Sequence, residues 1–314
     1  MQLNHRELRA FLAIARSGTI NAAAQAVGMT QPALSRSLKR LEATLQARLF
    51  DRHPGGMALT EFGRLVLQHA ELMEFETARL TEEIRMLNGT ATGFVRVGIV
   101  PSAISSLLRQ ALCDVFEVAP DVQVQIVEGA GNQMLDAVAN GRVDFAVIGQ
   151  VQSDIQDGVV TTPIGSEEVC VAARPDHPVF SHPALSFADL AAYRWILPRK
   201  GNAIWIGFNN MFRSQGLEPP TPHVATNSVH TLKTIVSQDD YLTMMSRVIF
   251  SLEERNGLIL PIPLRQAHWR RDILLARRSQ RSLLPATRLL LSAFEKQARA
   301  VIAGAEGAVH PPSA

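Results

Sequence analysis

The sequence lacks the features that mark several large classes of protein. Only two of its 314 residues are cysteines, Cys113 and Cys170, so no disulfide framework can form, and they do not have the spacing of a metal site. We expect both to be small buried hydrophobic residues. The longest apolar runs are too short to span a membrane, and the first residues, MQLNHRELRA, contain no apolar signal-peptide segment. The expected location is the cytoplasm, with no membrane partner.

The motifs of common enzymes are also missing. The sequence has no G-x-S-x-G nucleophile turn, no G-x-x-x-x-G-K-[ST] phosphate loop, and no two of its nine histidines lie four residues apart. The stretch EGAGNQML (128–135) begins like a dinucleotide-binding loop but lacks the third glycine. We therefore expect no enzymatic activity, no cofactor and no bound metal.

The charge that is present is distributed unevenly along the chain. With 46% apolar and 19% charged residues, the chain is typical of globular proteins, and its length allows more than one domain. Residues 1–60 carry eight basic and three acidic side chains, a net charge of +5, whereas residues 61–91 carry −3 and the remainder is neutral. A basic segment on a neutral body indicates that only the N-terminal part binds a polyanion such as DNA.

The segment from Thr19 to Glu42 predicts two short helices joined by a tight turn. Apolar residues share one face over 20–27, and Gly28, which tolerates positive φ, should end the first helix. Thr30 can cap the second helix, and Pro32 suits its first turn. Leucines at 34, 38, 41 and 45 predict a buried stripe. The polar residues off this stripe are Gln31, Ser35, Arg36, Lys39 and Arg40.

That polar face favours a helix-turn-helix that offers amide, hydroxyl and guanidinium groups to a DNA major groove. The alternative from these residues alone is an ordinary helical hairpin with a solvated charged face. A further helix is expected before it, over residues 6–17. After it, the stretch DRHPGGMALT (51–60) predicts a β-hairpin wing of the kind that lies along the phosphate backbone or minor groove.

A long helix is predicted from Glu61 to about Asn88, because this stretch contains no proline and is followed by Gly89. Its apolar positions repeat as an a/d seam over about three heptads. Such a seam favours pairing with another subunit, although it could instead pack against its own domain. The dimerisation residues that we predict are Val66, Met73, Leu80, Ile84 and Leu87, with Ala70 and Thr77 completing the seam.

Strands and helices alternate from residue 94 onward, which predicts parallel α/β sheets. We expect strands at 94–100, 122–129, 145–149, 169–175, 194–198, just before 226, and at 241–246. Helices are expected at 105–118, 132–140, 187–191, 203–215, after 228, and at 285–302. The resulting division is a DNA-binding domain (1–60), a linker and dimerisation helix (61–91), an effector-binding domain (92–303) and a disordered tail (304–314).

One run of residues closely resembles the signature of LysR-type transcriptional regulators. The matching pieces are Ala22-Ala23-Ala24, Gln31-Pro32-Ala33-Leu34-Ser35, Leu38 to Glu42, Leu49-Phe50-x-Arg52 and Leu59-Thr60-x-x-Gly63. The long linker helix and Gly141-Arg142-Val143-Asp144 extend the resemblance over nearly the whole chain. The fold class that it implies is a multidomain α+β protein: a winged helix-turn-helix, a linker helix, and a two-lobed α/β domain like that of periplasmic binding proteins.

The resemblance also implies partners. Members of this family are homo-oligomers, usually tetramers, that bind double-stranded DNA at promoters and carry a small-molecule effector between the two lobes; contact with RNA polymerase is a further expectation. Carried over by motif, the DNA-binding residues are Gln31, Pro32, Ser35, Arg36, Lys39, Arg40 and, at the wing, Arg52. Family wings often carry basic residues where this chain has Gly55 and Ala58, so we expect fewer wing contacts to phosphate and a shallower salt dependence.

Four loops that follow strands are expected to form the effector site, because backbone N–H groups there capture anions and carboxylates. They are 101–103, 129–132, 198–204 and 226–228. The effector-binding residues that we predict are Ser102 (the match to the family's pocket serine), Ala103, Gly131, Asn132, Lys200, Asn202, Thr226 and Asn227.

Each of these assignments has a structural alternative. Ser102 and Ser228 could contact the ligand or only cap helices, and Lys200 could meet a carboxylate or be solvated. Trp205 could stack on the effector or only pack, and His230 could be a ligand donor or a surface residue. Since the loops are rich in Ser, Asn, Thr and Lys, we expect an organic acid or a sugar-derived carboxylate as effector. The rival class for the whole chain is a cytoplasmic solute-binding or enzymatic α/β protein with an accessory helix-turn-helix.

Overall fold

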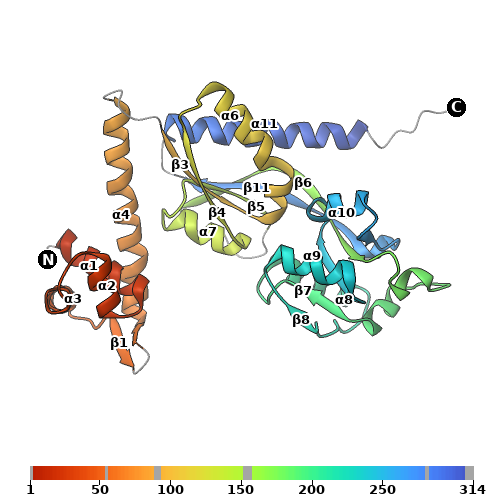
Figure 1. The fold of residues 1–314 in the computed structure, drawn as a ribbon, viewed down its shortest axis with the longest axis horizontal. Helices are drawn as coiled ribbons and strands as arrows, with labels where there is room; N and C mark the ends of the chain where they lie inside the picture. The colour runs from red at the N-terminus through yellow and green to blue at the C-terminus, as the bar shows by residue number, and fades with distance from the viewer. Residues whose placement is uncertain (1–2, 54–55, 88–92, 151–157, 280–282, 308–314) are drawn as a thin grey trace. The chain divides into compact units, whose positions relative to one another are not determined.

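The computed structural model describes residues 3–53, 56–87, 93–150, 158–279 and 283–307, and the chain falls into two units (Figure 1). The first unit consists of three helices, a two-stranded hairpin and a long helix. Its elements are α1 (His5–Ser17), α2 (Ile20–Ala26), α3 (Gln31–Leu45), β1 (Phe50–His53), β2 (Gly56–Leu59) and α4 (Glu61–Leu87).

The start and end of each N-terminal helix follow local signals in the sequence. The side chain of Asn4 caps α1 by accepting a hydrogen bond from the Arg6 N–H at 2.9 Å, and Gly18 ends the helix with φ of 69°. Gly28 follows α2 with φ of 64°, as predicted. Thr30 occupies the cap position of α3, but its side chain makes no capping hydrogen bond, so that prediction was wrong.

The predicted leucine stripe forms the core of this unit. Leu34, Leu38 and Leu41 are buried on α3 and pack with Phe11 and Ile14 of α1. The wing is also present: β1 and β2 pair antiparallel, and the Met57 N–H donates to the Gly18 carbonyl oxygen at 2.8 Å. The turn of the wing, with Gly55, lies outside the described residues.

The long helix α4 runs over the predicted residues, but the apolar residues of its seam do not all face the same way. Thr60 caps its start, with Oγ accepting from the Gly63 N–H at 3.0 Å. Val66 and Ala70 pack into the core of their own unit, which corrects the prediction that Val66 faces a second subunit. Met73, Leu80 and Ile84 are instead 46%, 57% and 50% exposed, and Phe62 and Leu65 are exposed at the start of the helix. The side chain of Leu87 lies outside the described part.

The second unit is built around one mixed sheet with the strand order β4-β3-β5-β11-β6-β9-β7-β8, with β10 paired to β6. The expectation of parallel sheets holds only in part. The pairs of β3 with β4 and β5, and of β7 with β8 and β9, are parallel, whereas β11 and β6 pair antiparallel with their neighbours. The strands are β3 (Phe94–Ile99), β4 (Gln123–Glu128), β5 (Phe145–Gly149), β6 (Val159–Ala173), β7 (Trp195–Leu197), β8 (Val224–Ala225), β9 (Leu242–Ser246), β10 (Leu260–Pro261) and β11 (His268–Arg278).

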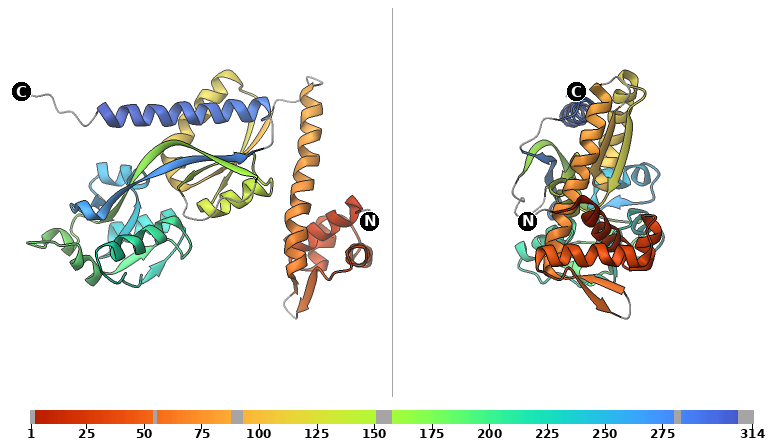
Figure 2. Two further views of the ribbon diagram at one scale, coloured as in Figure 1. Left: turned by 180° about the vertical axis from the view of Figure 1, so that it is seen from behind. Right: turned by 90° about the vertical axis from the view of Figure 1, so that its left-hand side faces the viewer.

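Two long strands carry this sheet from one lobe to the other. Figure 2 shows β6 and β11 running side by side between the lobes. In the first lobe, α6 and α11 cover one face of the sheet and α7 the other (Figure 1). In the second lobe, α8 and α9 pack on opposite faces, since Val169 and Val171 of β6 belong to the core under α8 and Cys170 to the core under α9.

The helices of the second unit mostly match the predicted ones. They are α5 (Pro101–Ala103), a π-helical turn (Ile104–Leu108), α6 (Arg109–Val118), α7 (Gly131–Ala139), α8 (Ala203–Ser214), α9 (Val229–Gln238), α10 (Ser251–Arg255) and α11 (Pro285–Gly307). Short 3-10 helices lie at Pro178–Ser181, Ala188–Ala192, Arg247–Phe250 and Arg265–Ala267.

Several predictions in this unit need correction. Helix α11 continues through 304–307, which were expected to be disordered, because its alanine-rich end favours helix; residues 308–314 lie outside the described part. Cys113 is exposed on α6 rather than buried. Cys170 is buried as expected, and burial raises the pKa of its thiol to about 12. Among the described residues, no helix is long and apolar enough to cross a membrane.

Candidate functional site

The outer face of α3 carries the side chains that were predicted to meet DNA. The helix begins at Gln31, with Pro32 in its first turn, and its leucines turn inward. Five of the predicted residues are exposed and Ser35 is half-buried. Within the described part of the first unit, this face is therefore open to a partner molecule. The exposed residues are Gln31, Pro32, Arg36, Lys39 and Arg40. The side chain of Arg52, on β1, lies outside the described residues.

A shallow hollow separates this face from the wing. It has a volume of about 220 Å³, and Asn21, Gln31 and His53 are among its polar lining residues. The hollow keeps its shape because Gly56 passes close to the turn after α1: a Cβ on Gly56 would lie 2.6 Å from the Gly18 carbonyl oxygen. The wing is therefore held against the turn between α1 and α2.

A larger cavity lies between the two lobes of the second unit. Its volume is about 420 Å³, and four helices begin at its wall: α5 at Pro101, α7 at Gly131, α8 at Ala203 and α9 at Val229. The N–H groups in the first turn of a helix have no partners within the helix, and they form its partially positive end. The cavity therefore favours a ligand rich in hydrogen-bond acceptors.

The structure brings five of the eight predicted effector residues to this cavity. The lining residues among them are Ser102, Gly131, Asn202, Thr226 and Asn227. Ala103 is fully buried in the first-lobe core, because it lies on the inward face of its short helix. Asn132 and Lys200 are exposed and do not line the cavity. An effector role for any of the eight stays a prediction.

Several of the lining side chains also order the loops that carry them. The Asn202 Oδ1 atom caps α8 by accepting from the Ile204 N–H at 2.9 Å, and the Asn227 Oδ1 atom accepts from the Arg199 N–H at 3.0 Å. Thr226 Oγ1 accepts from the Ser228 N–H at 3.1 Å.

Other candidates take the structural role that the sequence left open. Ser228 caps α9 by accepting from the Thr231 N–H at 3.2 Å, and Trp205 packs against the second-lobe core. His230 is exposed and does not line the cavity. Within the described residues, no group of three His, Cys, Asp or Glu side chains could hold a metal ion.

Three polar lining residues were missed by the sequence analysis: Glu128, Gln133 and Arg271. Glu128 ends β4 directly before one of the predicted loops, so its position was readable. Arg271 lies on β11, a strand that was not predicted, and nothing local in the sequence could have brought it to the cavity.

Arg271 forms an ion pair with the buried Glu167 at the wall of the cavity. The two residues face each other on β11 and β6, and the Arg271 Nε atom donates to the Glu167 Oε1 atom at 2.6 Å. Ser102 Oγ donates to the same oxygen at 3.1 Å, and Ser246 Oγ donates to Oε2 at 2.6 Å. A buried carboxylate is tolerated only when its charge and lone pairs are satisfied, and here three donors satisfy them.

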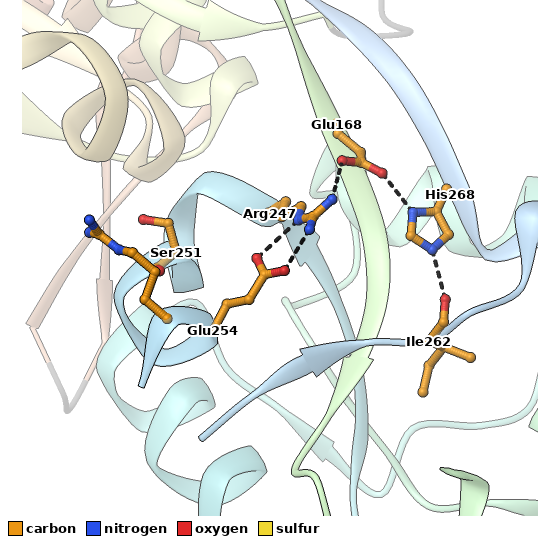
Figure 3. A network of polar contacts seen from close by, with 7 residues as sticks. Glu168, Arg247, Ser251, Glu254, Ile262 and His268 are labelled. Atoms are coloured by element: carbon orange, nitrogen blue, oxygen red, sulfur yellow. Dashed lines mark hydrogen bonds and ion pairs between the residues drawn. The ribbon is translucent and has the colours of Figure 1, made fainter. Parts of the chain in front are cut away.

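The next residue on β6, Glu168, anchors a second network (Figure 3). Because successive side chains of a strand point to opposite faces, Glu168 lies on the face opposite to Glu167. Glu168 Oε1 lies 2.7 Å from His268 Nδ1, and Arg247 donates to Glu168 Oε2 at 3.2 Å. Arg247 also donates to Glu254 at 2.9 and 2.5 Å. The Glu254 carboxylate, supported by Glu168, raises the pKa of Arg247 further above its ordinary value.

The comparisons with known proteins agree with this architecture. Residues 5–64 match the model for the bacterial regulatory helix-turn-helix protein, lysR family, and residues 88–299 match the LysR substrate binding domain. The chain is 30% identical over 249 residues to the small neutral protease regulatory protein of Streptomyces coelicolor, covering 78% of this chain and 74% of that protein.

Two further proteins are similar over almost the full length. The SDS degradation transcriptional activation protein of a Pseudomonas species is 28% identical over 313 residues, 98% of each chain. The crystal structure of CbnR, a LysR family transcriptional regulator, superimposes with a TM-score of 0.68 at 18% identity and covers 94% of this chain and 99% of CbnR. These proteins are regulators rather than enzymes.

The Glu168 network predicts a pH dependence of stability. Burial alone would raise the pKa of Glu168, but the hydrogen bonds from His268 and Arg247 outweigh it and lower the pKa below its ordinary value of 4.5. A lowered carboxyl pKa stabilises the folded state above the unfolded-state pKa, and that stabilisation is lost as the pH falls through the folded-state pKa. We expect the difference in unfolding free energy between wild type and Glu168→Gln to shrink as the pH falls below 4.5.

Urea unfolding followed by tryptophan fluorescence measures this difference, because Trp195, Trp205 and Trp269 all belong to the second lobe. Glu218→Gln, at an exposed position, is the matched control. A difference that persists unchanged to pH 3.5 would show that the network does not favour the charged carboxylate.

Proposed function

This chain belongs to the LysR family of bacterial transcriptional regulators, and on that basis we propose that α3 reads an operator and that a small organic acid bound between the lobes controls it. As a family member the chain is a DNA-binding regulator with an effector-binding domain. The observation that carries the effector proposal is the cavity of about 420 Å³ at which four helices begin.

For DNA, we propose that the exposed face of α3 enters the major groove. Gln31, Ser35 and Arg36 lie near the start of the helix, where base edges are read, with Pro32 against the backbone. Lys39 and Arg40, one turn further, neutralise phosphates, and Arg52 contacts the backbone from the wing. The wing positions Gly55 and Ala58 supply no charge, which reduces the salt dependence.

For the effector, size and polarity together support an organic acid or a sugar-derived carboxylate. The cavity volume lies within the range of small-molecule sites. The helix starts and Arg271 favour an anionic group, while Glu128 can accept hydrogen bonds from hydroxyl groups of a ligand. Ser102, Gly131, Asn202, Thr226 and Asn227 are the contacts that we propose.

For assembly, we propose a homodimer through α4 within a homotetramer. Met73, Leu80 and Ile84 form an exposed apolar stripe along the helix, which a second copy of the same helix would cover. Because its partner is chromosomal DNA, the regulator acts in the cytoplasm, where it can also meet RNA polymerase. An effector that contacts both lobes favours the lobe arrangement that it bridges, and this changes how the oligomer holds its operator.

Arg36→Ala should weaken operator binding by about 1–3 kcal/mol if the guanidinium reads a base. Fluorescence anisotropy with an operator fragment and with a shuffled duplex measures the loss, and Arg109→Ala, an exposed arginine of the second unit, is the control. An equal loss on both duplexes would make Arg36 a phosphate contact instead.

A thermal-shift screen of the full chain with organic acids tests the effector. A ligand at about 100 times its Kd adds about 2.7 kcal/mol to the free energy of unfolding, hence a rise of several degrees in Tm. For a ligand so identified, Thr226→Val should weaken binding up to about tenfold by removing one hydroxyl, whereas Thr234→Val, on the exposed side of α9, should not. Stabilisation by neutral or cationic compounds alone would contradict an acidic effector.

Replacing Leu80 and Ile84 together by Glu should shift the protein toward monomer, because two charges would enter the apolar seam. Sedimentation velocity measures the change, and Gln68→Glu, an exposed polar position on α4, is the control. Unchanged assembly would mean that the exposed stripe is not the interface.

A further inference from the structure

Glu167 lies at the point where the sheet passes from one lobe to the other. On β6, Ile164 belongs to the first-lobe core and Val169 to the second-lobe core. On β11, Ile273 belongs to the first-lobe core, and the pairing register shifts directly after it. Glu167 and its partner Arg271 are therefore the charged pair between the two cores.

The Glu167 carboxylate collects donors from both lobes. Ser102 lies in the first helix of the first lobe, Ser246 ends β9 in the second lobe, and Arg271 lies on the connecting strand. Ser102 and Arg271 also line the cavity, whereas Ser246 is fully buried away from it. The same carboxylate thus ties the lobes together and occupies two donors that a ligand would use.

We infer that Glu167 is an internal stand-in for the carboxylate of the effector: it holds Ser102 and Arg271 in the ligand-free protein, and an acidic ligand binds by competing with it for these donors. This inference rests on the proposed effector site and names the residue that sets its affinity for acids. Glu167 itself does not line the cavity, but its charge sets how tightly the cavity binds a negatively charged ligand.

The geometry at Arg271 explains how two carboxylates can meet one guanidinium. Both the Nε and the Nη2 atoms of Arg271 lie 2.6 Å from the Oε1 atom of Glu167. A guanidinium has five N–H donors, so its remaining donors can reach a ligand at the cavity wall. Two carboxylates at one guanidinium repel each other in a site shielded from water, so the charge of Glu167 lowers the affinity for an anion.

Competition at this residue also links binding to the lobes. A ligand that draws Ser102 away from Glu167 removes the first-lobe end of the tie, while Ser246 keeps the second-lobe end. The tie between lobes is then weaker in the liganded protein, and the energy of that change is supplied by the ligand's own contacts with the same donors.

The test uses acetate as the simplest carboxylate and acetamide as its uncharged counterpart of nearly equal shape. Thermal shifts of the full chain are measured against each probe at constant ionic strength, for wild type, Glu167→Gln and Glu168→Gln. The last variant makes the same chemical change one residue away, on the face of β6 that is turned from the cavity. We expect Glu167→Gln to bind acetate about tenfold more tightly than wild type, with acetamide binding unchanged and Glu168→Gln like wild type.

Unchanged or weaker acetate binding by Glu167→Gln would overturn the inference, since Glu167 would then only hold Arg271 in place. If Glu167→Gln does not fold, Ser246→Ala takes its place. It removes a donor to the same carboxylate outside the cavity, so that Glu167 holds Ser102 and Arg271 more strongly, and it should weaken acetate binding by a smaller factor. No change in Ser246→Ala would then overturn the inference. This assay contains no DNA and therefore tests only the role of Glu167. If a separate DNA-binding assay showed control by an uncharged effector, the chain would still be an effector-controlled regulator, but this inference would fail.

Discussion

The ion pair of the buried Glu167 with Arg271 is the interaction on which the effector region depends. Its two residues face each other on the only two long strands of the described sheet, at the position where those strands leave one hydrophobic core and enter the next. The buried Glu167 charge could not remain there alone, because a buried unpaired charge is strongly destabilising. The pair, with Ser102 and Ser246, therefore holds the cavity wall and the connection between the lobes in one arrangement.

The same electrostatic principle operates at both candidate sites, at different scales. On α3, leucines turn one face inward and leave side-chain cations on the other, which suits a long polyanion. At the cavity, the positive groups are mostly backbone N–H groups at four helix starts, with a single guanidinium that is already paired. Fixed, partly neutralised donors suit a small ligand, because they orient an acceptor without attracting every anion.

Features set by neighbouring residues could be predicted from the sequence, and features set by distant ones could not. Gly18 and Gly28 end helices through their own backbone freedom, and the leucines of α3 follow the helical period. The strand β11 has no such local signal, since HWRRDILLARR is stabilised by pairing with β5 and β6, and Arg271 was missed with it. A seven-residue repeat likewise does not indicate whether its apolar residues pack against a second subunit or against their own domain. The prediction that Val66 faces a second subunit is therefore wrong, since Val66 packs into the core of its own unit. All four predicted loops contribute residues to the cavity wall. The direction of single side chains, as at Ala103 and Asn132, could not be predicted, because it changes when a helix begins one residue earlier or later.

Amide hydrogen exchange of the full chain, with and without the organic acid that raises its Tm most, tests the central claim most directly. If the acid binds between the lobes, exchange should slow at the four helix starts, in residues 101–104, 131–134, 203–206 and 229–232, and it should slow in both lobes together. Protection confined to one lobe, or to α3 and the wing, would place the ligand elsewhere and contradict the account.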